Sequence, residues 1–107
     1  VSPDPDVRLE VEEGPVRPLF TMHEKSEELY KVARGVSREV GLDLGSGQFG
    51  GGSDGNFCGA LGVATLDGLG VCGAGIHTKQ EHLLVSSLVP RARLFAGLLV
   101  ELAKRVA

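Results

Sequence analysis

The chain has 107 residues, 42% of them hydrophobic, and its 11 basic and 14 acidic side chains give a net charge of −3. This size and composition are typical of one soluble globular domain rather than of a disordered chain. The dispersed basic residues argue against a nucleic-acid partner. No apolar run approaches the roughly 20 residues that span a bilayer, so we expect no membrane association.

Two cysteines, Cys58 and Cys72, form no CxxC pair and do not make a disulfide framework. The first residues, VSPDPDV, lack the basic and apolar regions of a signal peptide. We therefore expect a cytoplasmic protein with buried free thiols. Zinc ligation through Cys58, Cys72 and His77 is conceivable, although no standard zinc spacing supports it.

The N-terminal part predicts a strand and then a helix. Residues 6–13 alternate between apolar and charged side chains, which predicts a half-exposed strand. Thr21 and Glu24 have the pattern of a capping box before a helix over residues 22–40, and Gly41 is placed to end it. The apolar stripe of this helix consists of Leu29, Val32, Ala33, Val36 and Val40.

The C-terminal part predicts a short helix over residues 54–61, capped by Ser53 or Asp54, and a buried strand over residues 62–66. A second long helix follows, with Ser86 or Ser87 as its cap. Its expected buried face consists of Leu88, Phe95, Leu98, Leu99, Leu102 and Val106. This order predicts an α/β fold with helices on a buried sheet. One or two inner strands do not make an independent sheet, so we expect part of a larger domain.

Glycines are concentrated in residues 50–82, around carboxylates, thiols and histidines. Such freedom is needed where backbone turns sharply or approaches a ligand closely. Two interpretations of residues 50–54 remain open, an anion cradle before a helix and a tight turn with a helix cap. His77, at the end of a flexible loop, is a candidate metal ligand or acid–base group, although a lone histidine is often structural. Arg17, on an extended connector, is suited to bind a carboxylate or is simply a surface side chain.

Together, GGGSDGNFCGALGVATLDGLG and GAGIHTKQEHLLVSSLVPRARLFAGLL resemble the C-terminal end of the zinc exopeptidase family of glutamate carboxypeptidases, acetylornithine deacetylases and aminoacylases. The resemblance covers most of residues 17–106. It implies the C-terminal portion of a three-layer α/β/α catalytic domain over residues 16–107. Residues 1–15 would be the remnant of an inserted α+β lid or dimerisation domain, with 6–13 as its last strand.

The resemblance also implies roles for individual residues. His77 matches a zinc ligand of a two-metal site, and Gly52 matches a glycine whose N–H binds the substrate's terminal carboxylate. Arg17 matches an arginine that helps to clamp that carboxylate. Asp54 and Glu81 match acidic positions with a supporting or structural role.

The family's other zinc ligands and its general base have no counterpart here, because the chain has no His-x-Asp motif. We therefore expect a fragment of an enzyme that cleaves an amide bond next to a free carboxylate in a small peptide or N-acyl amino acid. Alone, it should hold at most one zinc ligand and be inactive. We also expect it to depend on an N-terminal part of the same protein, or to self-associate through strand 6–13.

Two other functions stay open. One is a non-catalytic binding or assembly module that reuses this half of the fold. The other is anion or nucleotide binding at residues 50–54 alone, without the Gly-Lys-Ser/Thr signature of a phosphate loop.

Overall fold

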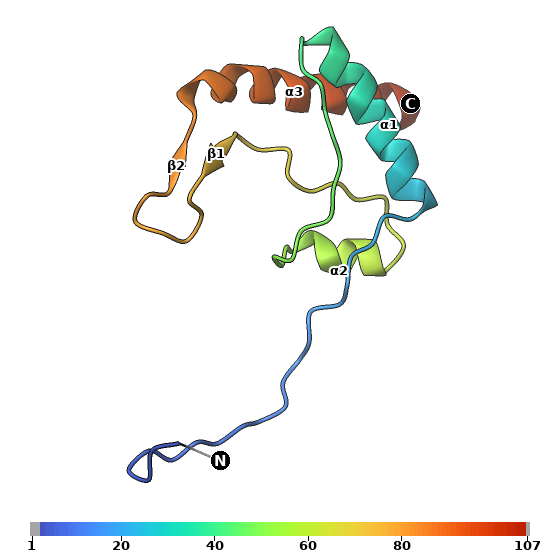
Figure 1. Cartoon of the computed structure of the whole chain (residues 1–107). Coiled ribbons are helices and arrows are strands. Elements are labelled where there is room, and N and C mark those ends of the chain that lie inside the picture. The colour runs from blue at the N-terminus through green and yellow to red at the C-terminus, as the bar shows by residue number, and fades with distance from the viewer. Residues whose placement is uncertain (1–2, 107) are drawn as a thin grey trace.

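The computed structural model describes residues 3–106. Its elements, in chain order, are helix α1 (Glu24–Glu39), helix α2 (Gly55–Ala60), strand β1 (Gly73–Ala74), strand β2 (His82–Leu83), the 3-10 helix η1 (Val85–Ser87) and helix α3 (Leu88–Val106). Figure 1 shows α3 running along one side of the molecule, with α1 against it, α2 on the opposite side and an extended N-terminal segment that reaches away from the rest.

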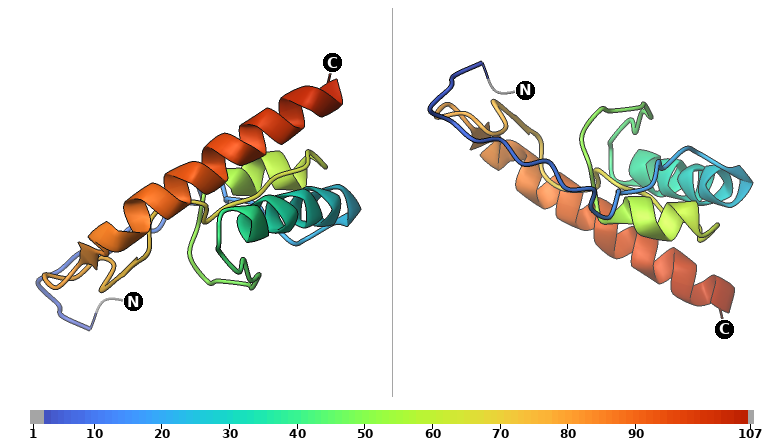
Figure 2. Two further views of the ribbon diagram at one scale, coloured as in Figure 1. Left: turned by 90° about the horizontal axis from the view of Figure 1, so that it is seen from above. Right: turned by 90° about the horizontal axis from the view of Figure 1, so that it is seen from below.

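Helices α1 and α3 form the core. Ala33 and Val36 of α1 are buried, as are Leu94 and Leu98 of α3. The helices approach closely at Gly97, where a Cβ atom would lie 2.7 Å from Cγ1 of Val36. Figure 2 shows α1 and α3 side by side from two directions, with the β1–β2 hairpin at the N-terminal end of α3.

The predicted helix over residues 22–40 is confirmed as α1, but its predicted N-cap is wrong. His23, not Thr21, is the N-cap residue, and no side chain caps the helix. Thr21 lies outside the helix because His23 is itself extended, with φ −113° and ψ 173°. The C-terminal prediction agrees with the structure: Gly41 has φ +79°, which glycine adopts without steric cost.

Two glycines end α1 and α2 in the same way. After α1, the N–H of Leu42 donates to the carbonyl of Ser37, and the N–H of Gly41 to that of Arg38. After α2, Val63 donates to Cys58 and Gly62 to Gly59, and Gly62 also has a positive φ. This is the Schellman arrangement, which satisfies carbonyls that the helix leaves unpaired.

The two predicted strands are wrong. Residues 6–13 and 62–66 form no ladder in the described structure, whose single sheet is the two-stranded antiparallel pair β1–β2. A segment with an alternating sequence forms a β-strand only when a neighbouring strand supplies hydrogen-bond partners for its backbone. Neither segment meets one here, and Leu9 and Val63 are exposed by 62% and 53%.

The sheet is therefore a hairpin rather than a layer. Gly73 pairs with Leu83 and Ala74 with His82. The predicted α/β content is present, but the helices pack on each other instead of on a buried sheet, because four residues in two short strands offer no face to cover.

Two further burial predictions need correction. In α3 the core position Leu94 was not expected, whereas Phe95 and Leu99 are half-exposed and Val106 is exposed. In this turn of α3 the side chain that enters the core is therefore that of Leu94 instead of the predicted Phe95. Both thiols, Cys58 and Cys72, are exposed rather than buried, because they lie outside the contact between α1 and α3. No helix formed by residues 3–106 has the length and apolarity that a bilayer crossing requires.

Candidate functional site

The side chain of Arg17 lies on the turn that leads into α2. A Cβ atom at Gly52 would lie 3.3 Å from both Cδ and Nη1 of Arg17, so the guanidinium group rests against the bare glycine backbone. Its Nη1 is 3.9 Å from Oδ1 of the fully exposed Asp54. Its Cζ lies 5.6 Å from the centre of the Phe57 ring, within the range of a cation–π interaction. The structure thus brings together Arg17, Gly52 and Asp54.

The connector that carries Arg17 is fixed along α2 at two further points. The side-chain amide of Asn56 donates to the carbonyl of Pro18 at 2.9 Å. The ring of Phe20 occupies the space above Gly59, which is buried, and a Cβ atom there would overlap the ring. These contacts fix the backbone on the C-terminal side of Arg17, whose side chain lies near Gly52 and the Phe57 ring.

Asp54, one of the two predicted caps, is the N-cap residue of α2, but no side chain caps the helix. Ser53 precedes it and bonds to the start of α2. Its hydroxyl accepts the N–H of Gly55 at 3.1 Å, and its carbonyl accepts the N–H of Asn56. The carboxylate of Asp54 makes no capping bond, which leaves it facing solvent beside Arg17. The glycine run therefore presents a helix start with a basic group next to it, an arrangement suited to an anion.

His77 lies in the turn between β1 and β2, away from Arg17 and the start of α2. Its φ is +63°, and it is the one non-glycine residue between 3 and 106 with a positive φ. The turn is closed by the N–H and hydroxyl of Thr78, which both donate to the carbonyl of Gly75. The imidazole is exposed and neither ring nitrogen bonds to a described residue, so both nitrogens are free for a ligand.

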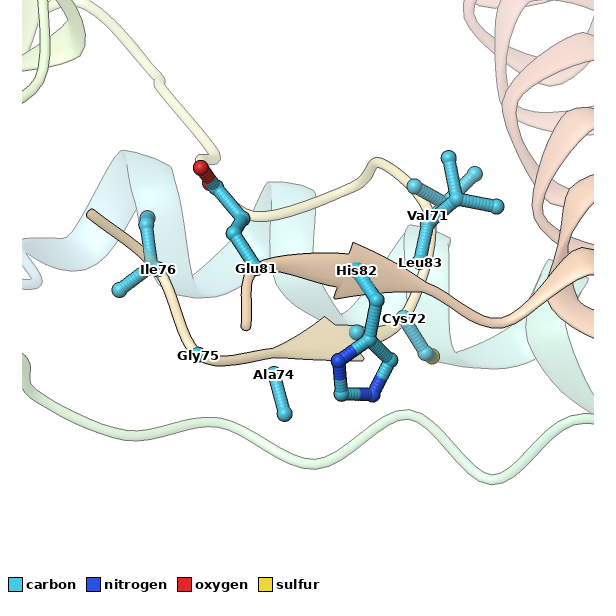
Figure 3. A pocket seen from close by; sticks show the side chains of 9 residues that line it. Val71, Cys72, Ala74, Gly75, Ile76, Glu81, His82 and Leu83 are labelled. Atoms are coloured by element: carbon cyan, nitrogen blue, oxygen red, sulfur yellow. The ribbon is translucent and has the colours of Figure 1, made fainter. Parts of the chain in front are cut away.

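The hairpin borders an open depression of about 670 Å³ (Figure 3). The figure shows Glu81 and Ile76 on one face of the hairpin, while His82 points to the other with Ala74. The Nδ1 of His82 lies 2.8 Å from the carbonyl of Gln80, so this imidazole has a structural partner that His77 lacks. The lining residues are Val71 to Ile76 and Glu81 to Leu83.

Two side chains fix the loop before the hairpin through contacts that the sequence did not predict, although Ser87 was named as a candidate helix cap. Arg91 of α3 donates through Nε to the carbonyl of Gly70 and through Nη2 to that of Gly68, both at 2.7 Å. The hydroxyl of Ser87 accepts the N–H of Cys72 at 2.9 Å. Their spacing of four residues, at the start of a helix that follows a glycine-rich loop, was the available signal.

A metal site can be built only in part from this chain. Within residues 3–106, no three histidine, cysteine, aspartate or glutamate side chains are grouped so that they could hold a metal ion. The alternative zinc site of Cys58, Cys72 and His77 is therefore wrong. The exposed imidazole of His77 fits a single ligand, and further ligands would have to come from outside the described residues.

Comparison with known proteins shows the family of the chain. Residues 6–101 match Peptidase family M20/M25/M40. The chain is 31% identical over 102 residues to carboxypeptidase G2 of Pseudomonas sp. (strain RS-16). The aligned residues make up 94% of this chain and 24% of that protein. It is 37% identical over 76 residues to succinyl-diaminopimelate desuccinylase of Thioalkalivibrio sulfidiphilus (strain HL-EbGR7), covering 70% of this chain and 20% of that protein.

No solved structure matches the chain. The chain spans about a quarter or less of the curated relatives that it matches. The family match extends over nearly its whole length and includes the corner at Gly52, the hairpin and most of α3. The chain therefore belongs to Peptidase family M20/M25/M40, as the resemblance of its glycine-rich motifs predicted.

Proposed function

We propose that this chain is the carboxylate-binding part of a zinc-dependent exopeptidase or amidohydrolase of the glutamate carboxypeptidase type. The complete enzyme would cleave an amide bond next to a free carboxylate in a small peptide or N-acyl amino acid. Residues 16–107 would belong to its catalytic domain and residues 1–15 to its lid domain. The observation that carries the proposal is the position of the Arg17 guanidinium against Gly52 at the start of α2.

We call Arg17, Gly52, Asp54 and Phe57 together the carboxylate corner. Each of these residues has a chemical task in the proposal. Arg17 would bind the substrate carboxylate through charge-assisted hydrogen bonds, with the N–H of Gly52 as a second donor. Phe57 would help to keep the guanidinium in place through the cation–π contact. Asp54, at 3.9 Å, is loosely paired and fully exposed, so it would release Arg17 to a substrate at little cost.

His77 would supply one zinc ligand in the complete enzyme. Zinc polarises a scissile carbonyl and activates water in hydrolases of this kind. Glu81, the residue directly before β2 in the same hairpin, would support the ligand or the turn that carries it. The general base and the remaining ligands would come from an N-terminal part of the protein, so the 107-residue chain alone would be inactive.

The carboxylate corner can be tested on the chain itself. Titration of the ¹⁵N-labelled chain with N-acetylglutamate should shift the amide signals of residues 52–55. We expect the Arg17→Gln variant to weaken this binding by about 10-fold or more, because one charged hydrogen-bond donor is lost. Arg34→Gln, which removes an exposed arginine of α1, is the matched control and should leave the binding unchanged. Equal binding by both variants would contradict the proposal.

A separate experiment tests the hydrolase. The chain mixed with an N-terminal part of the protein should bind zinc and hydrolyse N-acyl amino acids, whereas the chain alone should not. Metal-dependent hydrolysis by the chain alone would show that the expected inactivity is wrong. Tight association without zinc would instead favour the alternative, a non-catalytic assembly module.

A further inference from the structure

The end of η1 and the first turn of α3 hold the glycine-rich loop at three backbone positions. Arg91 bonds to the carbonyls of Gly68 and Gly70, and Ser87 accepts the N–H of Cys72. The Ser87 hydroxyl also donates to the carbonyl of Leu84 at 2.6 Å. Ser87 is the last residue of η1 and Arg91 lies in the first turn of α3, and both side chains reach the same loop. We name Ser87 and Arg91 together the α3 clamp.

The chemistry of Arg91 suits this loop. Gly68 has φ +76°, and its N–H bonds to the carboxylate of Asp67, so the loop is turned without any ladder or helix to pair its carbonyls. A planar guanidinium presents several N–H donors in a fixed fork and reaches two carbonyls at once. Lysine, a single point charge on a flexible stem, cannot reproduce both bonds with the same geometry.

The clamp is continuous with the hairpin that carries His77. Strand β1 begins at Gly73, directly after the Cys72 amide that Ser87 holds. The carbonyl of Cys72 accepts the N–H of Leu84 at 2.8 Å, which closes the open end of the hairpin. The ladder itself is two residues long on each side. So short a ladder fixes the shape of the hairpin but not its direction relative to α3.

We propose that Arg91 is a positioning residue: together with Ser87 it sets the orientation of the β1–β2 hairpin on α3 and so the place of the His77 imidazole. For the role of His77 as a zinc ligand, this inference rests on the proposed function. For the placement of the hairpin, it rests on the hydrogen bonds alone.

The placement can be measured in the 107-residue chain by amide hydrogen exchange of Arg91→Gln. The reporters are the N–H groups of Cys72 and Leu84, with amides of α1 as an internal reference. We expect exchange at both reporters to become about 10-fold faster, because two charge-assisted hydrogen bonds are lost, and α1 to be unaffected. Arg93→Gln is the control: it removes the same charge from an exposed residue of α3 whose side chain makes no hydrogen bond or ion pair to the described residues. Equal exchange in the two variants would overturn the proposal.

A second measurement concerns the metal. In a complex of the chain with an N-terminal part of the protein, zinc release into a chelator should be about 10-fold faster for Arg91→Gln than for Arg93→Gln, with KM unchanged, because the carboxylate corner does not involve Arg91. Arg91→Lys should recover part of the difference. Zinc release at the same rate in both glutamine variants would overturn the link to His77. If the unsubstituted complex binds no zinc, the proposed function fails, whereas the exchange comparison still decides for or against the clamp.

Discussion

At the residue scale, the backbone of His77 is the most unusual feature of the chain. An L-residue in the left-handed region costs roughly 1–2 kcal/mol, and histidine is one of the few residues found there more often than average. Such strain persists when the surroundings determine it, and it is concentrated at functional sites. The turn at Gly75 and Thr78 supplies those surroundings here.

This strain leads to a prediction for His77→Gly. Because glycine adopts a positive φ freely, the substitution should raise the free energy of unfolding by about 0.5–1 kcal/mol while removing the imidazole. Urea unfolding followed by circular dichroism would measure it. The control is His82→Gly, in β2, where φ is not positive and glycine should destabilise by a similar amount. A loss of stability in both variants would show that the His77 backbone is not strained.

The corner at Gly52 shows what sequence reasoning reaches at this scale and what it misses. The family resemblance of the motifs pointed to Arg17 and Gly52 as a pair, and the structure places the Arg17 side chain against Gly52. Their binding roles remain predictions. The contacts of Asn56 with Pro18 and of Phe20 with Gly59 could not be anticipated, because they join segments about 40 residues apart that have no common periodicity.

At the element scale, the helices were predictable and the strands were not. The stripe that includes Ala33 and Val36 is local, and it predicted α1 to within two residues at its start. The alternation of residues 6–13 is equally clear, but a strand depends on a partner that the pattern does not specify. The one sheet that forms, at Gly73 and His82, is too short for any periodicity to reveal.

The contact between α1 and α3 can be tested with two glycines that both lie inside a helix but differ in their surroundings. Gly97 of α3 faces Val36, whereas a Cβ at Gly35 of α1 would meet no atom within 4 Å. Gly35→Ala should stabilise the chain by about 1 kcal/mol through helix propensity. Gly97→Ala should lose this gain or destabilise, because the new methyl group lies too close to Cγ1 of Val36.

Thermal unfolding of the two variants gives the comparison. Combining Gly97→Ala with Val36→Ala separates the two effects, since the smaller side chain removes the overlap at the cost of a cavity. The two substitutions should therefore be non-additive, with the double variant more stable than the sum predicts. Strictly additive values would mean that Gly97 and Val36 are not in contact.

At the scale of the whole molecule, the chain buries little of its apolar surface. Among residues 3–106, the buried hydrophobic core consists of four side chains, from α1 and α3. Many large apolar residues are exposed, and the N-terminal segment makes the molecule elongated, with extents of 61 × 34 × 20 Å. Figure 1 shows this segment extending from the body without a neighbour. The chain spans 24% of the length of carboxypeptidase G2, so the exposed apolar residues have no covering partner that its own sequence could reveal.

The extended segment over residues 6–13 carries the last prediction, self-association. Its backbone pairs with no other strand among the described residues, and Val7, Leu9 and Val11 are all more than half exposed. An unpaired extended segment with apolar side chains is a template for pairing with another chain. Sedimentation velocity of the 107-residue chain should therefore show a mass that rises with protein concentration.

Substitution of one residue locates the contact. Val11→Lys places a charge in the segment and should shift the chain toward the monomer, because lysine on a strand edge opposes pairing. Leu61→Lys is the matched control: Leu61 is as exposed as Val11, 83% against 85%, but follows α2. It should leave the association unchanged. A monomer at all concentrations would show that segment 6–13 does not drive association, and equal effects of the two lysines would assign association to exposed apolar surface in general.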